Sequence, residues 1–409
     1  MVSNDEIFSR ERLAGYEPEL LARSVALIVG AGALGQNAAL NLALAGVGEI
    51  RIVDQDQFEP HNRTRSPLFP LPAEQARYGL NKARVVACKL RPLMTAARPL
   101  VRYAHAWIQA LGDGAFKDVS VILACVDKPS ARAYLSDKAR LHGIPLVEGG
   151  FEAAEISLSC FPAALGDEAQ RAPCWRCSHQ ETEIEGGLFS CLTYAERVGE
   201  LGFIPAIQNA AATLAGLQAE AAILSLHEQK RWALKFRTMD LNIRTGQSGL
   251  VKLSTDPFCP GLHRTLDAAP IKLKTSSGET VGQLLQELGE LLGGHARVEL
   301  EPPLVWTASC TQCKKMAEVR SRMWEWATSL RCQSCEGAFP LAVEKITDTP
   351  LIYYYLDAGL AEELLKATCA ELGFPPLALI EASFAEHPPQ LFELAGTLEH
   401  LYEEGENNE

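Results

Sequence analysis

The run SVALIVGAGALG at residues 24–35 limits what this chain can fold into more than any other feature. Residues 25–29 are apolar and rich in β-branched side chains, which predicts a buried strand. The glycines that follow allow a tight turn into a helix whose free N–H groups would face a phosphate, and they are Gly30, Gly32 and Gly35. A second strand over residues 50–53 ends at Asp54, a position suited to a ribose. The pattern predicts one βαβ unit of a nucleotide-binding fold.

The charges after Asp54 indicate which nucleotide this unit would bind. Oxidoreductases use the same glycines and acid, but a dehydrogenase must leave an apolar slot for nicotinamide, whereas a triphosphate carries about four negative charges that need cations and a metal. The chain supplies such groups at His61, Asn62, Arg63, Arg65 and, on a later helix, Lys82. A further apolar strand, 119–126, ends in Asp127, followed by Lys128 and Arg132. Because the carboxyl ends of parallel strands meet at one crevice, Asp54 and Asp127 are predicted to converge, with Asp127 placed to hold Mg²⁺.

Taken singly, each of these residues also fits a simpler interpretation. A surface arginine or lysine is usually solvated, which applies to Arg63, Arg65 and Lys82. An aspartate after a strand often caps a helix, as Asp127 could. The long and ordered combination nevertheless favours a nucleotide triphosphate site.

The same segment resembles the ThiF/MoeB and ubiquitin-activating (E1-like) superfamily, whose pattern is a glycine turn, DxD, an SNLxRQ loop, a GxxK helix start and a CxDn strand end. The matching residues are Asp54, Asp56, Asn62, Arg65, Lys82, and Asp127 after Cys125. The loop departs from the pattern, because Thr64 and Ser66 stand where the family has leucine and glutamine. Upstream, FSRERL resembles the family's RYxRQ opening, so Arg10 would enter the nucleotide site of a neighbouring subunit.

This resemblance spans residues 10–263 and implies a fold, a cofactor and an assembly. The fold is α/β, a Rossmann-like adenylation domain with a mainly parallel sheet. The cofactors are ATP and Mg²⁺. The assembly is a homodimer or a pseudo-symmetric pair.

Six of the twelve cysteines form three CxxC pairs, a pattern typical of zinc sites. We expect no secretory signal, and a reducing cytoplasm then favours metal over disulfides. The spacing CxxC, eighteen residues, CxxC predicts a zinc ribbon with ligands Cys310, Cys313, Cys332 and Cys335. A pair of thioredoxin-like redox motifs fits poorly, because no βαβ pattern surrounds these cysteines.

The resemblance implies partners for the remaining pair, Cys174 and Cys177. The family has a second cysteine cluster beyond the crossover helix, where this chain reads DPFCPGLH. Cys259 and His263 would therefore complete a Cys₃His zinc site. His263 could instead be a loop histidine, and this alternative stays open.

Cys191 differs from the other cysteines outside these clusters. Those others lie in apolar helix or strand patterns typical of small core residues, and they are Cys88, Cys125, Cys160 and Cys369. Cys191 lies in a polar, glycine-containing stretch. In the resembling family this stretch, near 178–204, is the crossover loop whose cysteine attacks the acyl adenylate, which makes Cys191 the candidate nucleophile. Because MoeB-like members work without such a cysteine, a bystander role stays open.

The length of 409 residues predicts several domains. We expect the adenylation domain over 1–255, a second zinc-ligand segment and small α/β connector over 256–300, the zinc ribbon over 301–345, an α+β segment over 346–402 and a disordered tail over 403–409. Within the connector, Thr280 and Gln283 have the spacing of a capping box, which predicts a short amphipathic helix.

Charge and hydropathy exclude some partners. A net charge of −13 argues against nonspecific nucleic-acid binding, and no apolar segment approaches membrane-spanning length. We therefore expect a cytoplasmic protein. The ribbon alone is basic, a cluster that suits an acidic partner or a solvated face, at Lys314, Lys315, Arg320, Arg322 and Arg331.

The resemblance implies ATP-dependent adenylation of the C-terminal carboxylate of a ubiquitin-like protein with a diglycine-type C-terminus. Thioester formation on Cys191 and transfer to a ubiquitin-conjugating-like enzyme would follow, as in a bacterial conjugation pathway. One alternative is a ThiS/MoaD-like sulfur-carrier adenylyltransferase, although the lack of a recognisable rhodanese module and the added ribbon favour conjugation. Another is an inactive scaffold that binds partners through the ribbon, which the intact Arg65, Lys82 and Asp127 argue against.

Overall fold

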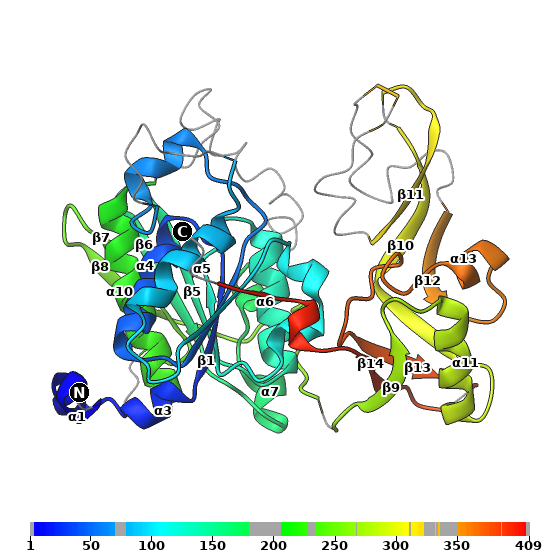
Figure 1. Ribbon diagram of the computed structural model, residues 1–409, viewed down its shortest axis with the longest axis horizontal. Helices are drawn as coiled ribbons and strands as arrows, with labels where there is room; N and C mark the ends of the chain where they lie inside the picture. The colour runs from blue at the N-terminus through cyan, green and yellow to red at the C-terminus, as the bar shows by residue number, and fades with distance from the viewer. Residues whose placement is uncertain are drawn as a thin grey trace. The chain divides into compact units, whose positions relative to one another are not determined.

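The computed structural model describes residues 4–69, 79–179, 206–227, 234–266, 268–310, 312–322, 332, 334–335, 351–385 and 387–405. The chain divides into two compact units (Figure 1). The first comprises Met1–Ile108, Phe116–Asp267 and Tyr402–Glu409, and the second comprises Gln109–Ala115 and Ala268–Leu401. The expected boundary at residue 255 thus falls inside the first unit, and the expected connector 256–300 is divided between the two.

The first unit is built on a nine-stranded sheet in the order β15-β3-β2-β1-β4-β5-β6-β7-β8. Its central strands are parallel, and they are β1 (Val25–Val29), β2 (Glu49–Val53), β3 (Leu100–Ala104), β4 (Val121–Ala124) and β5 (Leu146–Glu152). Antiparallel strands follow on both sides, namely β6 (Glu155–Phe161), β7 (Arg237–Asn242), β8 (Ser248–Lys252) and β15 (Glu403–Glu404). The α/β, Rossmann-like fold class predicted from the sequence is confirmed.

The apolar run of β1 is explained by burial on both faces of the sheet. Ala26 and Ile28 share one core with the helices α4 (Ala33–Ala45), α5 (Lys82–Leu90) and α10 (Gln208–Leu226), while Leu27 and Val29 on the opposite face are also buried. Side chains alternate along a strand, so a strand covered on both faces is apolar throughout. The helix α6 (Pro129–Leu141) packs against β4 and β5.

The remaining helical segments of the first unit are short. They are α1 (Asn4–Ile7), α2 (Ser9–Leu13), α3 (Pro18–Ala22) and α7 (Asp167–Arg171). Short 3₁₀ segments also occur, namely η1 (Pro60–Arg65), η2 (Arg91–Leu93), η3 (Ile108–Leu111), η4 (Asp113–Phe116) and η5 (Trp175–Ser178). Among the described residues, no helix combines the length and the apolar character needed to cross a membrane.

The C-terminal segment corrects one expectation. Residues 403–409 were expected to be disordered because they are acidic and polar, but Glu403 and Glu404 pair with β3 as the antiparallel strand β15. The Tyr103 hydroxyl hydrogen-bonds the Glu403 carboxylate, and the Arg91 guanidinium donates to the Gly405 carbonyl at 3.0 Å. Without this strand, the backbone N–H and C=O groups on the outer edge of β3 would lack partners. Pairing with them orders residues 403 and 404 despite their acidic, polar composition. Residues 406–409 lie outside the described part of the chain.

The second unit contains a six-stranded sheet and its own core. The sheet order is β11-β10-β13-β14-β9, and β12 pairs with β10. The strands are β9 (Ile271–Ser276), β10 (Arg297–Ser309), β11 (Met316–Arg322), β12 (Leu351–Leu356), β13 (Leu379–Ser383) and β14 (Gln390–Ala395). The helical segments are α11 (Val281–Leu292), α13 (Glu362–Lys366) and η8 (Leu398–His400).

The predicted amphipathic helix of this unit is confirmed as α11. The Gln283 amide N–H donates to the Thr280 hydroxyl at 3.2 Å, and the Thr280 N–H donates to the Gln283 side-chain oxygen at 2.9 Å. These two bonds form the predicted capping box. The apolar face of α11 is buried in the core of the unit, through Val281, Leu284, Leu285 and Leu288.

Candidate functional site

The glycine turn lies between β1 and α4, and its three glycines have different roles. Gly30 has φ +96°, and a Cβ there would lie 2.4 Å from the carbonyl oxygen of Cys125. A Cβ on Gly35 would lie 1.8 Å from the carbonyl oxygen of Gly30. Both positions therefore require glycine for the turn and for close packing. A Cβ on Gly32 would meet no described atom within 4 Å, so the start of α4 faces open space where a phosphate could approach its N–H groups.

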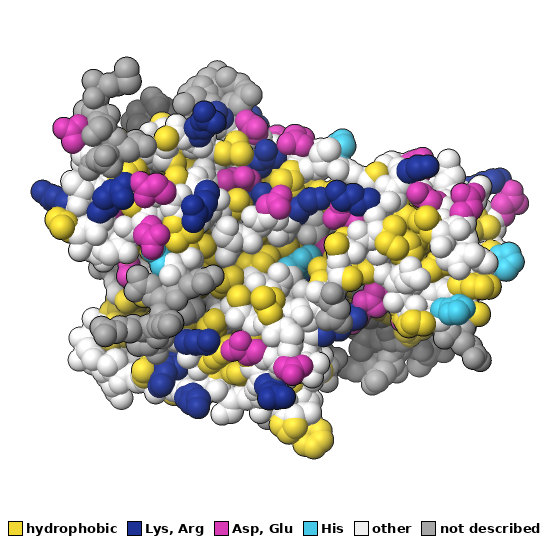
Figure 2. All heavy atoms as spheres, turned by 90° about the horizontal axis from the view of Figure 1, so that it is seen from below, with side chains coloured by type: hydrophobic (Ala, Val, Ile, Leu, Met, Phe, Trp, Pro, Cys, Tyr) yellow, Lys and Arg dark blue, Asp and Glu magenta, His cyan; other side chains and the backbone are white. Residues whose placement is uncertain are grey.

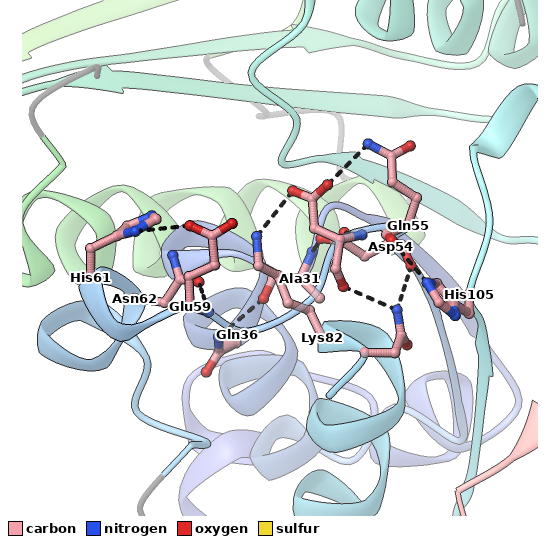
Figure 3. A network of polar contacts seen from close by, with 11 residues as sticks. Ala31, Gln36, Asp54, Gln55, Glu59, His61, Asn62, Lys82 and His105 are labelled. Atoms are coloured by element: carbon pink, nitrogen blue, oxygen red, sulfur yellow. Dashed lines mark hydrogen bonds and ion pairs between the residues drawn. The ribbon is translucent and has the colours of Figure 1, made fainter. Parts of the chain in front are cut away.

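Asp54 is fixed against this turn at the end of β2 (Figure 3). Its Oδ2 accepts the Ala31 N–H at 2.6 Å, and its Oδ1 accepts the Asp56 N–H at 2.7 Å. Burial, followed by the negative charge of Asp56, raises the pKa of Asp54 to about 6. The carboxyl group therefore lies beside the N-terminus of α4 and changes its protonation state near pH 6.

Lys82 contributes a cation to the same place. Its Nζ lies 3.0 Å from Oδ2 of Asp56, and its backbone N–H donates to the Asp56 carbonyl at 2.9 Å. The Asn81 side chain caps α5 and donates to the carbonyls of Asp54 and Asp56, both at 3.1 Å. Burial alone would raise the pKa of Asp56, but the charge and hydrogen bond of Lys82, together with the Gln55 hydrogen bond and the charge of Lys128, outweigh burial and the pKa is lowered. The Asp54–Asp56 loop and the start of α5 therefore form one hydrogen-bonded group.

Asn62 and Arg65 lie on η1. Asn62 is buried, and its Oδ1 accepts the Glu59 N–H at 2.9 Å (Figure 3). This bond holds the side-chain oxygen within its own turn and fixes the orientation of the NH₂ group, which is the donor that a phosphate could accept from. Arg65 is half-buried, and burial lowers its pKa.

The end of β4 carries a second group of charges. The Asp127 side chain is exposed, and Lys128 next to it is the N-cap residue of α6. Arg132 donates to the Val126 carbonyl at 2.6 Å and forms an ion pair with the buried Glu148 on β5. Burial lowers the pKa of Arg132 to about 10. The buried ion pair therefore fixes the backbone that precedes Asp127.

Sequence reasoning missed two residues of this region. Glu148 interrupts the apolar run of β5, so an acid within a predicted strand was a signal that could have been used. Trp107, whose ring lies 4.1 Å from the Nζ of Lys128, gave no such signal because the contact depends on strand order. Arg10 lies on α2 with an exposed side chain.

The first cysteine cluster brings together the four residues that the sequence grouped. The Sγ of Cys174 lies 3.7 Å from that of Cys177 and 3.6 Å from that of Cys259. The Nε2 of His263 lies 3.4 Å from Cys174 Sγ and 3.5 Å from Cys177 Sγ. Tetrahedral zinc with bonds of about 2.3 Å separates its sulfur ligands by about 3.7 Å, so these side chains fit a zinc ion.

The helix α6 holds the two loops that carry this cluster. The Ser136 hydroxyl accepts the Trp175 N–H at 3.1 Å. The Asp137 carboxylate accepts from Arg176 Nε and from the Leu262 N–H, both at 3.0 Å. Arg140 donates to the carbonyls of residues 172 and 173. The cluster is therefore built onto the same helix that starts beside Asp127.

The second cluster lies in the other unit. Cys310 and Cys313 are at the turn between β10 and β11, and Cys332 and Cys335 come after β11 in the chain. The Sγ atoms of Cys310 and Cys335 are 3.5 Å apart, and those of Cys313 and Cys332 are 3.6 Å apart. All four ligand atoms lie within 4.8 Å of one another, which suits a Cys₄ zinc site. Much of the predicted ribbon, including 323–331 and 336–345, lies outside the described residues.

The basic cluster of the ribbon is partly engaged within the unit. Arg320 lies 2.8 Å from the Glu318 carboxylate and also pairs with Glu363, while Arg322 is buried and donates to the Glu301 carbonyl at 3.0 Å. These contacts engage two of the predicted basic residues, Arg320 and Arg322, within the unit. Figure 2, which views the molecule from below, shows basic and acidic side chains interspersed on the face turned to the viewer. Arg331 lies outside the described residues.

Cys191 and most of the predicted crossover loop, 178–204, also lie outside the described residues, which resume at 206. The structure therefore adds nothing to the predicted role of Cys191.

Comparisons with known proteins show which family the chain resembles. A sequence model of the ThiF family matches residues 12–261. The adenylyltransferase and sulfurtransferase uba4 of Aspergillus fumigatus is 33% identical over 201 residues, which cover 47% of this chain and 40% of the relative. The protein of the same name from Emericella nidulans is 34% identical over 239 residues, covering 56% and 48%. The match thus spans less than half the length of these relatives.

A likeness to solved structures concerns the fold alone. A crystal structure of E. coli MccB with MccA-N7isoASN superposes with a TM-score of 0.50 at 17% identity. The superposition covers 64% of this chain and 76% of the other.

Proposed function

This chain belongs to the ThiF family, and from that premise we propose that it transfers AMP from ATP to the C-terminal carboxylate of a small, ubiquitin-like sulfur-carrier protein. The observation that supports this most strongly is the grouping of Asp54, Asp56 and Lys82 beside the glycine turn, at the carboxyl ends of parallel strands. Such a crevice offers amide N–H groups, a ribose acceptor and a cation together.

The choice of carrier is inferred from the relatives. Both fungal proteins are named adenylyltransferase and sulfurtransferase, which supports the sulfur-carrier reaction better than the conjugation pathway favoured by the sequence. The two reactions share the adenylation step and differ in what happens to the acyl adenylate. Conjugation through an E2-like enzyme is therefore the alternative that the test must exclude.

The proposed step is an attack of the carrier carboxylate on the α-phosphorus of ATP. A carboxylate oxygen forms the new bond to phosphorus, the bond from phosphorus to the oxygen shared with the β-phosphate breaks, and pyrophosphate leaves with that oxygen. The carboxylate is already ionised near pH 7, so no general base is needed. Catalysis would rest on positioning and on neutralising charge.

The predicted site residues would have separate roles in this reaction. Asp54 would accept from the ribose, and the start of α4 would bind phosphate oxygens. Additional donors to the phosphates would be Lys82, Arg65 and the NH₂ group of Asn62. The exposed Asp127 carboxylate suits a hard cation, and Mg²⁺ held there would neutralise phosphate charge. In a homodimer, the exposed Arg10 would reach the site of the partner subunit.

The decisive experiment is ATP–pyrophosphate exchange with a small diglycine-ended carrier protein. We expect exchange that requires the carrier and Mg²⁺. A carrier whose last glycine is removed is the matched control and should give only background exchange. Tight NADH binding with no heat from Mg·ATP in calorimetry would overturn the proposal. Persistent transfer of the carrier to an E2-like protein would instead select conjugation.

Asp54 should give nucleotide binding a pH dependence. Its raised pKa of about 6 means that it is largely protonated below that pH, when it accepts hydrogen bonds poorly. We expect the affinity for Mg·ATP to rise between about pH 5 and 7, and Asp54→Asn to bind weakly with no such rise in calorimetry. The same shift affects folding stability in the opposite direction. Because the folded state binds the Asp54 proton more tightly than the unfolded state does, this proton stabilises the fold fully below about pH 3.8. The stabilisation is lost as the pH rises through about 6.

Each of the two cysteine clusters should hold one structural zinc ion. The donor sets are Cys174, Cys177, Cys259 and His263 in one unit, and Cys310, Cys313, Cys332 and Cys335 in the other. We expect Cys259→Ser to lower the zinc content from two ions per chain to about one, as measured by inductively coupled plasma mass spectrometry. Cys88→Ser, outside both clusters, should keep two. Full zinc content in a His263→Ala variant would remove that ligand from the proposal.

Cys191 remains a proposal from the sequence. If it is the nucleophile, Cys191→Ala should keep pyrophosphate exchange and lose any reducible covalent adduct with the carrier. An adduct that survives in this variant would exclude Cys191.

A further inference from the structure

Trp107 and Lys128 meet across the candidate nucleotide site. The Nζ of Lys128 lies 4.1 Å from the centroid of the Trp107 ring. Trp107 comes three residues after the end of β3, and Lys128 comes four residues after the end of β4. In the sheet these strands are separated by β2 and β1, so at about 4.8 Å per strand they lie about 14 Å apart. The contact must therefore pass over the ends of β2 and β1, where Asp54 and the glycine turn lie.

The segment that carries Trp107 is tied to the ribose side of the crevice. The ring of His105 donates to the Gln55 carbonyl at 2.9 Å, and the Asp54 N–H donates to the Ala104 carbonyl at 3.2 Å (Figure 3). In a doubly wound sheet the phosphates lie at the β1 turn and the ribose at the tip of β2. Because the base is bonded to the ribose on the side away from the phosphates, it would continue in the same direction, towards the neighbouring strand β3. Trp107 is thus on the side where a base would lie.

Lys128 belongs to the phosphate side. It follows Asp127 and occupies the N-cap position of α6 after the end of β4, and β4 pairs with β1, which leads into the glycine turn. The charge of Lys128 adds to that of Lys82 in lowering the pKa of the Asp56 carboxyl. Both lysines are partly buried. Two cations therefore belong to this crevice: Lys82 is paired with Asp56, and Lys128 lies on the Trp107 ring.

We propose that Trp107 and Lys128 are nucleotide-binding residues: the indole face now covered by Lys128 receives the purine base, and the Lys128 ammonium moves to the phosphates. A purine stacks on an indole face, and a lysine on such a face makes a modest interaction that a ligand can replace. The ammonium gains a stronger partner, because phosphate carries full negative charge. This inference rests on the proposed function. It adds to the proposed nucleotide site an aromatic surface for the base and a further cation for the phosphates.

The test uses the full-length protein with Mg²⁺ and α,β-methylene-ATP, which cannot be cleaved at the α-phosphate. We expect the analogue to change the tryptophan emission of the wild type and of Trp306→Phe, and the change to be lost in Trp107→Phe. Trp306 is the matched control, because it also carries a cation on its ring, with Arg320 at 4.6 Å, but belongs to the other unit. Trp107→Phe keeps an aromatic ring and should fold normally by circular dichroism.

Affinities measured by calorimetry give the second readout. Trp107→Ala should weaken binding of the analogue by about ten- to a hundredfold, as expected for the loss of base stacking. Lys128→Met should weaken the triphosphate analogue by about tenfold but leave adenosine binding unchanged, because its role is towards phosphate charge. Lys128→Arg should recover most of this loss.

Two different failures can be told apart. If the wild type binds the analogue and Trp107→Ala binds it equally well, or if the emission change persists in Trp107→Phe, the inference is wrong while the proposed function stands. If the wild type neither binds the analogue nor catalyses pyrophosphate exchange, both fall together.

Discussion

Replacing Lys82 with methionine is expected to lower carrier-dependent pyrophosphate exchange by about a hundred- to a thousandfold. The Lys82 side chain is 13% exposed and its ammonium lies 3.0 Å from Asp56, so it is held at the crevice before any nucleotide arrives. A charge that is fixed in advance stabilises developing phosphate charge without reorganisation, and removing one such donor costs about this factor. The measurement is the exchange rate at saturating ATP and carrier.

Lys89→Met is the matched control for this variant. Lys89 lies on the same helix, in its last turn rather than its first. Lys89→Met should keep exchange within about twofold of the wild type, because Lys89 lies at the opposite end of the helix from the site and its charge contributes little to stability. An equal loss of exchange in both variants, or a full rate in Lys82→Met, would remove Lys82 from the proposed site.

The largest expected effect on stability is that of Arg132→Met. Arg132 and Glu148 form an ion pair with side chains that are 14% and 7% exposed. Removing the arginine leaves a buried carboxylate without its counter-charge, which costs about 3–5 kcal/mol in comparable cases. We expect a loss of this size in the free energy of unfolding of the first unit, measured by urea titration.

The double variant Arg132→Met with Glu148→Gln makes this prediction sharper. A neutral amide costs less to bury than an unpaired carboxylate, so the second change should recover a large part of the lost stability. Arg244→Met, at an exposed turn, should change stability by no more than about 0.5 kcal/mol. If Arg132→Met is as mild as Arg244→Met, the pair contributes nothing to folding.

Local patterns predicted the parts of the molecule that depend on local physics. The βαβ unit around Asp54 follows from an apolar run, three glycines and one acid, because each acts within a few residues of the next. The capping box at Thr280 was equally visible, since both partners lie on one helical turn. The cysteine clusters were grouped by motif spacing and by the family resemblance, and the geometry of the described residues fits those groups.

Features that depend on strand order were not predictable from the sequence. Trp107 and Lys128 meet only because β3 and β4 stand on opposite sides of β2 and β1 in one sheet. Tyr103 and Glu403 pair across 300 positions of the chain. Glu148 was visible as an acid in an apolar strand, but its partner Arg132 could be identified only once α6 lay against β5.

The strand β15 has a practical consequence for anyone who wishes to study the nucleotide-binding unit alone. A fragment cut after residue 267 would lose Tyr402, whose ring lies 5.6 Å from the fully buried Arg51 guanidinium, and would leave β3 as a bare sheet margin. Such a margin can recruit backbone from another molecule, so the shortened protein should be prone to precipitate. A soluble minimal version needs the last few residues supplied back, for example through a short engineered connection.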